Sequence, residues 1–562
     1  MANPRAPGVT ITERDISEVL VPAGTSIGAL VGGAYTGPTN QRVLITNDKE
    51  FVQTFGVPKK GSDSEFTYYA ALEFLKESGF LWFTRATVGT DTVGFVTSTS
   101  AGVVTEGTVT EKSSTALLAI AGYKEGNTPI KYESMERAAA ACLNVGATGP
   151  GADSADIGIT LVTSADTTTT GEGYDYGYNW VGKYPAANVL YRLNIYSKDS
   201  QDTVADAGWS GTDPLKTIKP VESFIVSNDE DAKDFDGNSM YVKDVVNGFS
   251  KYVYVTTNGE NLADGSHAAV TPLATGAANI VTADVVGAWD LYLSKESVNV
   301  NLLLAPYTDS NKSDAAAGVA NTRRDCMAIC QIGQEDLTEP TDSSLDLTSA
   351  KATSYVASYA GGEYVFDKYT RKNIVLPNQI FAAKAYAFTD NVANVWNAPA
   401  GLTRGAIDGI DAYKSFNESA IGFMYNKNVN TGKSIRGAGQ YIWGQKTGQK
   451  RASALDRVNV RRLLLYIENS VEPLLVGYLF EQNTDAVRSR VVSNIDSFLQ
   501  TIFAGGGLTK FSTVCDGTNN TPQVIDNNEL AVDIYVQPSK TIEFINLQVT
   551  ITRTGVNFSE IA

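Results

Sequence analysis

Residues that could carry acid–base or metal chemistry are few in this chain. The chain has 562 residues but a single histidine, His267, in the segment ADGSHAA, which we expect to form a surface loop. One imidazole supplies neither a catalytic triad nor a histidine-rich metal site. The acidic residues Asp229, Glu230, Asp231 and Asp234 offer oxygen ligands for a divalent cation, but a solvated acidic turn is the favoured interpretation.

Two segments resemble phosphate-binding loops without completing them. NTGKS at Asn430–Ser434 ends like a Walker A loop, but that pattern requires a glycine where this chain has Lys427. GAGQYIWG has Ile442 where the third glycine of a dinucleotide-binding motif belongs. We therefore expect no nucleotide site, no cofactor, no metal and no catalytic residue.

The cysteines indicate free thiols. The chain has four, Cys142, Cys326, Cys330 and Cys515, too few for a disulfide scaffold of this length. Cys326 and Cys330 lie in an apolar segment that predicts a buried strand, where a spacing of four residues separates them by roughly 13 Å. This distance excludes a disulfide between them.

Length and composition indicate a globular chain with several domains. Of the residues, 43% are hydrophobic and 19% are charged, and 562 residues exceed what one core accommodates. The first residues contain no apolar segment typical of a signal peptide, and we find no uninterrupted apolar run of about 18 residues. We expect the protein to be made and used in soluble form.

Charge is unevenly distributed along the chain. The net charge is −17, yet between positions 433 and 462 the only acid is Asp456. The basic residues of this segment are Lys433, Arg436, Lys446, Lys450, Arg451, Arg457, Arg461 and Arg462. A solvated basic face and a contact surface for an acidic partner, including copies of the chain, both fit this pattern. Nucleic acid does not, because the net charge repels phosphates and no nucleic-acid-binding motif accompanies the segment.

Hydrophobic periodicity predicts two long helices near the C-terminus. Leu464, Ile467 and Val471 have helical spacing, and Pro473 is expected in the first turn of a following helix. A further helix is expected from about Thr484 to Ala504, ended by Gly505 to Gly507. Its apolar stripe consists of Val487, Val491, Ile495, Phe498 and Ile502.

Both ends of the chain contain alternating segments typical of strands. Residues 1–22 include Val9, Thr10, Ile11 and Thr12, a lone strand that needs a sheet edge, either in a neighbouring copy or in its own domain. In Thr541–Arg553 the apolar residues Ile545, Leu547, Val549 and Ile551 alternate strictly with polar ones. This pattern predicts a half-buried strand with a well-specified register.

The sequence between residue 27 and residue 367 contains two kinds of pattern, one typical of α/β structure and one typical of β-rich structure. Strands at 27–32, 43–45 and 80–85, with helices capped near Asn47 or Asp48 and at Ser64, predict an α/β layer. Residues 95–220 are rich in Thr, Ser, Gly and Tyr, with one clear strand at Tyr191–Ser197, and predict a β-rich insertion. Residues 221–367 return to α/β, with helices expected at Val281–Ser294 and at 313–324, the latter capped by Ser313.

Several motifs occur in the order found in one family. They are FDKYTRKNIVLPNQIFAAKAYAFTD (Phe366–Asp390), VWNAPAGLTRGAI (Val395–Ile407), YIWGQKT (Tyr441–Thr447), RVNVRRLLLYIENSV (Arg457–Val471), LFEQN (Leu479–Asn483) and CDGTNNTPQVIDNNEL (Cys515–Leu530). This region resembles the C-terminal domain of contractile-tail sheath proteins from phages and related injection machines. The resemblance covers roughly Ser297 to the C-terminus and the first 90 residues or so.

The resemblance implies an α+β or α/β multidomain chain. It has a strand-donating arm at 1–22, a middle α/β domain at 23–94 and 221–367, and a β-rich outer domain at 95–220. An α/β inner C-terminal domain follows at 368–540, and a second strand-donating arm at 541–562. The eight basic residues would then face the tail tube or a neighbouring subunit.

The function implied is structural. Sheath subunits form stacked rings, expected to be hexameric, around the tail tube and contract to drive it through the host envelope during genome delivery. The partners implied are copies of the chain, the tube protein, and the baseplate and tail terminator proteins, without direct nucleic-acid contact or membrane insertion. The location implied is the virion tail, assembled in the bacterial cytoplasm. A β-rich carbohydrate-binding or carbohydrate-active virion protein is the alternative, supported by Tyr and Asp residues of the insertion.

Overall fold

The computed structural model describes most of the chain outside the N-terminal segment and parts of the insertion. The described residues are 26–34, 37–56, 65–86, 92–99, 104–110, 141–147, 157–163, 184, 189–197, 220–250, 252–257, 259, 267–273, 282–333, 345–369 and 371–549. They divide into two compact units, one formed by 469–549 with 396–398 and the other by the rest. The boundary falls between Glu468 and Asn469, inside a helix.

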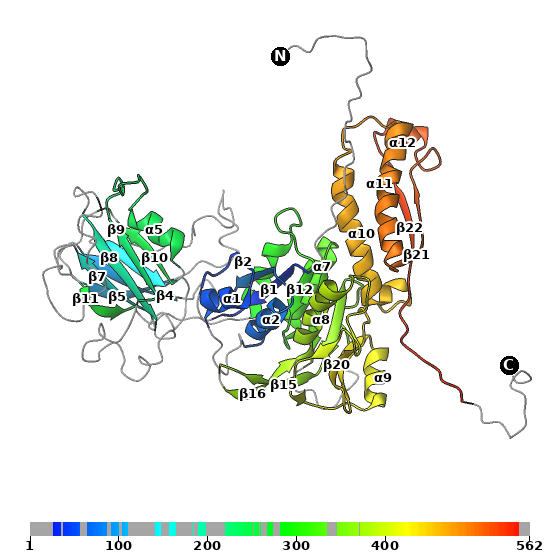
Figure 1. Cartoon of the computed structure of the whole chain (residues 1–562), viewed down its shortest axis with the longest axis horizontal. Coiled ribbons are helices and arrows are strands. Elements are labelled where there is room, and N and C mark those ends of the chain that lie inside the picture. Colours follow the sequence, from blue (N-terminus) through cyan, green and yellow to red (C-terminus); the bar gives the residue numbers. More distant parts are fainter. Residues whose placement is uncertain are drawn as a thin grey trace, which may run out of the picture. The chain divides into compact units, whose positions relative to one another are not determined.

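A large mixed sheet is the centre of the second unit (Figure 1). Within the described residues its strand order is β17-β20-β19-β14-β13-β12-β1-β3-β2, parallel from β19 to β3 and antiparallel at both edges. The strands are β1 (Gly28–Gly32), β2 (Arg42–Ile45), β3 (Leu81–Arg85), β12 (Leu302–Ala305), β13 (Met327–Ile332), β14 (Val356–Ala360), β17 (Ala406–Ile407), β19 (Val429–Ile435) and β20 (Gly439–Trp443).

Helices cover both faces of this sheet because its central strands are apolar on both sides. Consecutive residues of β12, such as Leu303 and Leu304, enter two different cores on opposite faces of the sheet. One core contains residues of α1 (Asp48–Phe55), α2 (Glu65–Leu75) and α8 (Asn378–Val392). The other contains residues of α6 (Thr282–Ala288), its 3-10 continuation Trp289–Tyr292 and α7 (Ser310–Arg323). The predicted α/β layer is present.

Smaller elements complete this unit. A three-stranded sheet has the order β16-β15-β18. Its strands are β15 (Gly362–Asp367), β16 (Lys372–Pro377) and β18 (Asp411–Ala412), and α9 (Glu418–Asn426) precedes β19.

The insertion consists of two four-stranded antiparallel sheets around a common apolar core. One sheet contains β4 (Thr92–Thr99), β5 (Val104–Thr110), β6 (Ala141–Ala147) and β10 (Val253–Thr257). The other contains β7 (Ile157–Thr163), β8 (Tyr191–Ser197), β9 (Glu222–Val226) and β11 (His267–Pro272). Helix α5 (Val242–Phe249) contributes Val242 and Val246 to the core.

The insertion is therefore longer than the 95–220 that we expected. Strands β9 and β10, which we placed in the α/β layer, instead pair with β8 and β6. The local pattern of a strand does not reveal its partner, which lies far away in the sequence. The expected boundary at Lys368 also differs from the structure, in which α8, β19 and β20 belong to the same compact unit as β1.

The C-terminal unit combines helices with a β-hairpin. Its elements are the second half of α10 (Val458–Val476), then α11 (Asp485–Ala504), β21 (Leu508–Val514), α12 (Pro522–Asp526) and β22 (Asp533–Pro538).

Two predicted helix boundaries are wrong. Helix α10 continues through Pro473, which lies on its exposed side while Val471 and Leu474 remain buried. Burial of that apolar side outweighs the loss of one helical hydrogen bond near the end of the helix. Helix α7 begins earlier than expected, because Asp309 rather than Ser313 accepts the capping hydrogen bond, from the Asn311 backbone N–H.

Candidate polymerisation interface

The hairpin β21–β22 is held by packing against α11. The two strands pair antiparallel from Lys510–Gln537 to Val514–Asp533. Phe511 of β21 contacts Phe503 of α11 with ring centroids 6.2 Å apart. Residues of β22 alternate between half-buried and exposed, and Tyr535 on the exposed side is 62% exposed. Among the described residues, each strand has one edge that pairs with no other strand.

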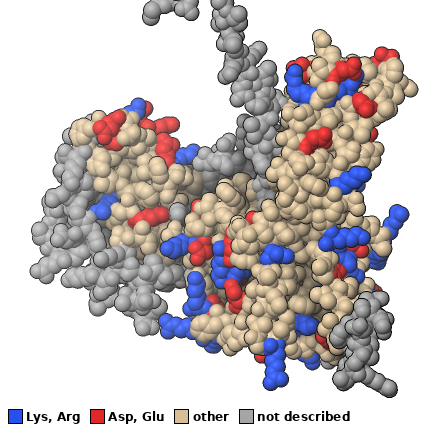
Figure 2. Space-filling view, turned by 45° about the vertical axis from the view of Figure 1, so that its right-hand side comes forward, with Lys and Arg blue, Asp and Glu red and all other residues tan. Residues whose placement is uncertain are grey.

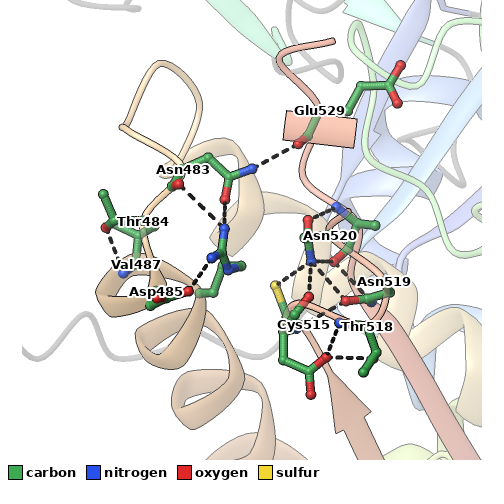
Figure 3. Close-up of polar contacts among 12 residues, drawn as sticks. Asn483, Thr484, Asp485, Val487, Cys515, Thr518, Asn519, Asn520 and Glu529 are labelled. Carbon is green, nitrogen blue, oxygen red and sulfur yellow. Dashed lines mark hydrogen bonds and ion pairs between the residues drawn. The ribbon is translucent and has the colours of Figure 1, made fainter. Parts of the chain in front are cut away.

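Helix α11 forms where the sequence predicts it, and side-chain hydrogen bonds fix its first turn (Figure 3). The Thr484 hydroxyl accepts a hydrogen bond from the Val487 backbone N–H at 3.4 Å. The guanidinium of Arg488 contacts the Asp485 carboxylate and the Asn483 side chain. The Asn483 amide in turn donates to the Glu529 carbonyl at 2.9 Å, so that the helix start is tied to the segment before β22.

Asparagine side chains brace the connection between β21 and β22 (Figure 3). Asn520 donates to the Ala531 carbonyl at 2.9 Å and accepts from the Ala531 backbone N–H at 2.8 Å. Asn519 donates to the Val514 carbonyl at 2.9 Å. Asp516 accepts from the Thr518 side chain and backbone, and these hydrogen bonds lower the pKa of its carboxyl. The connection therefore holds the two strands at a fixed separation.

Trp396 is a structural residue of this unit that sequence reasoning did not single out. Its indole N–H donates to the Gly505 carbonyl at 3.2 Å. A Cβ at Gly507 would lie 2.9 Å from the Trp396 ring. The glycines after α11 thus allow this ring to approach, in addition to ending the helix. The motif VWNAPAGLTRGAI contains the tryptophan, but nothing in its spacing points to its partner.

The segment after β22 is the main candidate for a contact outside the chain. Thr541–Val549 forms no strand and leaves the hairpin as the red trace in Figure 1. Its apolar side chains are 75–86% exposed, namely Ile542, Phe544, Ile545, Leu547 and Val549. The described part of the expected strand, Thr541–Val549, is therefore not paired with any described strand. Val9 to Thr12 and Ile551 lie outside the described residues.

Two of the eight basic residues do not face solvent, so the predicted basic patch requires correction. The Arg461 guanidinium lies 3.7 Å from the ring centroid of Tyr355, and Arg461 is 4% exposed. Arg462 donates to the Asp390 carboxylate at 2.6 Å, and both side chains are almost completely buried. A charge without a partner is costly to bury, and here each arginine has an aromatic or acidic partner.

The other six basic residues differ in how they are engaged. Lys433 lies 3.4 Å from Glu418 and over the Trp443 ring, and Lys446 donates to the Tyr425 carbonyl. Arg457 pairs with the neighbouring Asp456 at 3.0 Å. Arg436, Lys450 and Arg451 are exposed. On the face seen in Figure 2, basic and acidic side chains are interspersed.

The residues considered for other chemistry form no site in the part of the chain described. His267 begins β11 instead of lying in a loop, and NTGKS lies within β19. In the acidic turn, Asp234 accepts hydrogen bonds from the side-chain amide and the backbone N–H of Asn238 and from the backbone N–H of Asp236. The side-chain hydrogen bond from Asn238 contributes most to lowering the pKa of the Asp234 carboxyl. Cys326, Cys330 and Cys515 are free and buried, and burial of the first two was expected.

Two searches of the described residues gave negative results. They contain no group of three or more His, Cys, Asp or Glu side chains able to hold a metal ion. No helix among them has both the length and the apolar character needed to cross a membrane.

Comparison with known proteins supports the resemblance seen in the motifs. Residues 451–552 match the phage tail sheath C-terminal domain. The chain is 25% identical to the tail sheath protein of Enterobacteria phage T4 over 99% of both chains. It is 30% identical to the tail sheath protein of Vibrio phage KVP40 over 60% of this chain and 54% of that one.

A solved structure shares the fold. The sheath tail protein of Desulfitobacterium hafniense superposes with a TM-score of 0.55 at 13% identity, covering 95% of this chain and all of that one. These comparisons favour a sheath protein over the carbohydrate-binding alternative. The chain is a homologue of the tail sheath proteins of contractile phage tails.

Proposed function

We propose that this protein is the structural, non-enzymatic subunit of a contractile tail sheath. It polymerises as stacked rings around an inner tail tube and contracts to drive that tube through the host envelope. The observation that carries the proposal is the exposed apolar segment Thr541–Val549, which directly follows a two-stranded sheet whose outer edges pair with no other described strand.

The exposed segment has the properties of a strand donated to another molecule. Each of its large apolar side chains would gain about 1.5–3 kcal/mol on complete burial, a gain that this chain alone does not realise. A donated strand would also pair its backbone N–H and carbonyl groups with a sheet edge. Strict alternation from Ile545 to Val549 suits such pairing, since one face would be buried and the other solvated.

The hairpin β21–β22 is the acceptor that we propose in a neighbouring copy. A two-stranded sheet is marginally stable and gains from added strands. Its two edges could receive the two arms, one around Val9–Thr12 and one around Ile545–Ile551. Contacts of this kind join different surfaces and do not close on themselves, so they generate a helix or stacked rings.

Arms of this kind permit contraction without loss of the polymer. Main-chain hydrogen bonds can persist while the folded units rotate as rigid bodies. Several tethers per subunit make individually weak contacts sum to a stable lattice. Contraction would release free energy stored in a kinetically trapped extended sheath, without nucleotide hydrolysis. The partners are the tube, baseplate and terminator proteins, and assembly takes place in the bacterial cytoplasm.

Polymerisation by strand donation is tested by changing only the apolar face of the C-terminal arm. We expect replacement of Ile545, Leu547 and Val549 by serine to abolish tube formation and leave soluble monomers with unchanged circular dichroism. The matched control replaces their polar neighbours Asn546, Gln548 and Thr550 by serine, and should assemble like the wild type. Normal tubes from the first variant would exclude strand donation by this arm.

A further inference from the structure

Glu363 is a buried carboxyl group that has no basic partner. It lies on β15 and is 1% exposed. Its neighbours across the sheet are Leu376 on β16 and Ala412 on β18. One of its carboxyl oxygens, Oε2, is buried and accepts no hydrogen bond from any described residue. An ionised carboxylate in such an environment carries a large desolvation penalty.

Asn378, the first residue of α8, presents a second unsatisfied oxygen close by. It is 2% exposed, and its side-chain amide donates to the Ala360 carbonyl at 2.9 Å. Its Oδ1 atom is buried without a donor among the described residues. Both side chains border Gly432, where a Cβ would lie 2.9 Å from Glu363 Oε1 and 3.2 Å from Asn378 Nδ2. Both side chains therefore pack against Gly432.

The charged groups on the surrounding elements do not neutralise Glu363. Lys384 of α8 contacts Glu73 and Asp408, and Lys433 of β19 contacts Glu418. On β16, Lys372 pairs in register with Asp367, at the opposite end of β15 from Glu363. The charged side chain that acts on Glu363 is Asp411 of β18, which is itself an acid. Ionisation of Glu363 would thus place a negative charge on a buried side chain that has another acid, Asp411, nearby.

We propose that Glu363 is a neutral carboxylic acid in the folded protein and donates its proton to Oδ1 of Asn378, as a proton-dependent lock between β15 and α8. In this arrangement one proton would give a hydrogen-bond partner to both unsatisfied oxygens, Oε2 of Glu363 and Oδ1 of Asn378. Burial, with a smaller contribution from Asp411, raises the pKa of Glu363 to about 8, which agrees with this protonation state.

The lock has a defined pH dependence. Because the pKa is higher in the folded state than in the unfolded state, the folded state holds an extra proton between about pH 4.5 and about pH 8. The stability that the neutral acid supplies is complete below this window and is lost as the pH rises through it. Within the window, the equilibrium constant for local folding falls about tenfold per pH unit.

Hydrogen exchange in β15 and β18 tests the lock locally. Between about pH 6 and pH 8, protection of Gly362–Asp367 should fall by up to ~100-fold in the wild type relative to Glu363→Gln, whose amide mimics the neutral acid. The control is Glu418→Gln, whose side chain is 90% exposed, and it should behave like the wild type. Equal pH dependence in the wild type and in Glu363→Gln would refute the proposal.

Infrared spectroscopy reports the protonation state of the Glu363 carboxyl group directly, provided that Glu363→Gln has the circular dichroism spectrum of the wild type. The difference spectrum of wild type minus Glu363→Gln at about pH 6.5 should contain the carbonyl band of a protonated carboxylic acid. A carboxylate band in its place would overturn the proposal. So would recovery of wild-type protection at about pH 9 on addition of Na⁺ or Ca²⁺, because the space would then bind a metal cation.

Discussion

Arg462 of α10 and Asp390 of α8 form an ion pair of 2.6 Å, with 3% and 2% of their side chains exposed. The Arg462 guanidinium also lies 5.1 Å from the ring centroid of Tyr386, whose hydroxyl is 2.9 Å from that of Tyr359. The first half of α10 is thereby attached to the helix that covers the large sheet. Arg462, which the sequence pattern places on a contact surface, is therefore part of the core.

Breaking this pair should destabilise the protein without a direct effect on partner binding. We expect Arg462→Met to cost about 3–5 kcal/mol, because Asp390 would remain buried without its partner. Replacing both residues, Arg462→Met with Asp390→Leu, should recover most of that loss. Urea unfolding followed through the tyrosine and tryptophan signals measures both effects. Purely additive losses in the double variant would show that the two side chains are not coupled.

The exposed basic residues are the ones to test for docking. Reversing Arg436, Lys450 and Arg451 to glutamate should weaken association with an acidic tube surface or a neighbouring subunit. The loss should be largest at low salt, where exposed charges are least screened. Reversal of Lys49, Lys243 and Lys414, which are also exposed, is the control. Equal assembly of both triple variants around tubes at every salt concentration would exclude this surface.

Gly507 and Gly517 give a matched test of packing at Trp396. A Cβ at Gly507 would meet Ile502 at 2.7 Å and Trp396 at 2.9 Å, whereas one at Gly517 meets nothing within 4 Å. Gly507→Ala should therefore cost about 1–3 kcal/mol through overpacking. Gly517→Ala should be close to neutral. Thermal unfolding of the two variants compares them directly, and equal midpoints would contradict the described packing.

The buried cysteines should be unreactive in the folded protein. Burial raises the pKa of Cys330 to about 12 and also raises the pKa values of Cys326 and Cys515. In a Cys142→Ser background, a thiol reagent at about pH 8 should label none of the three before denaturation and all three afterwards, because the thiolate is the reactive form. Labelling of the native protein would show that these sites open.

Local signals in the sequence predicted much of the fold. The apolar stripe from Val487 to Ile502 predicts α11 through contacts within a few residues, and the structure confirms a helix at Asp485–Ala504. The α/β layer followed in the same way, from buried strands alternating with capped helices.

The rest depended on partners far away in the sequence. The burial of Arg461 and Arg462 requires Tyr355 and Asp390, and the assignment of β9 and β10 to the insertion requires strands β8 and β6. No periodicity within α10 or β9 encodes these contacts. The relation between Glu363 and Asn378 likewise appears only once β15, α8 and β19 are folded together.

Negative-stain electron microscopy of the purified chain, concentrated at moderate salt, tests the sheath proposal most directly. We expect hollow tubes of uniform diameter, and their loss when Thr541–Ala562 is deleted. If the protein alone remains monomeric, co-expression with the tube protein should produce sheathed tubes. Small closed oligomers without tubes, even in the presence of the tube protein, would contradict the account.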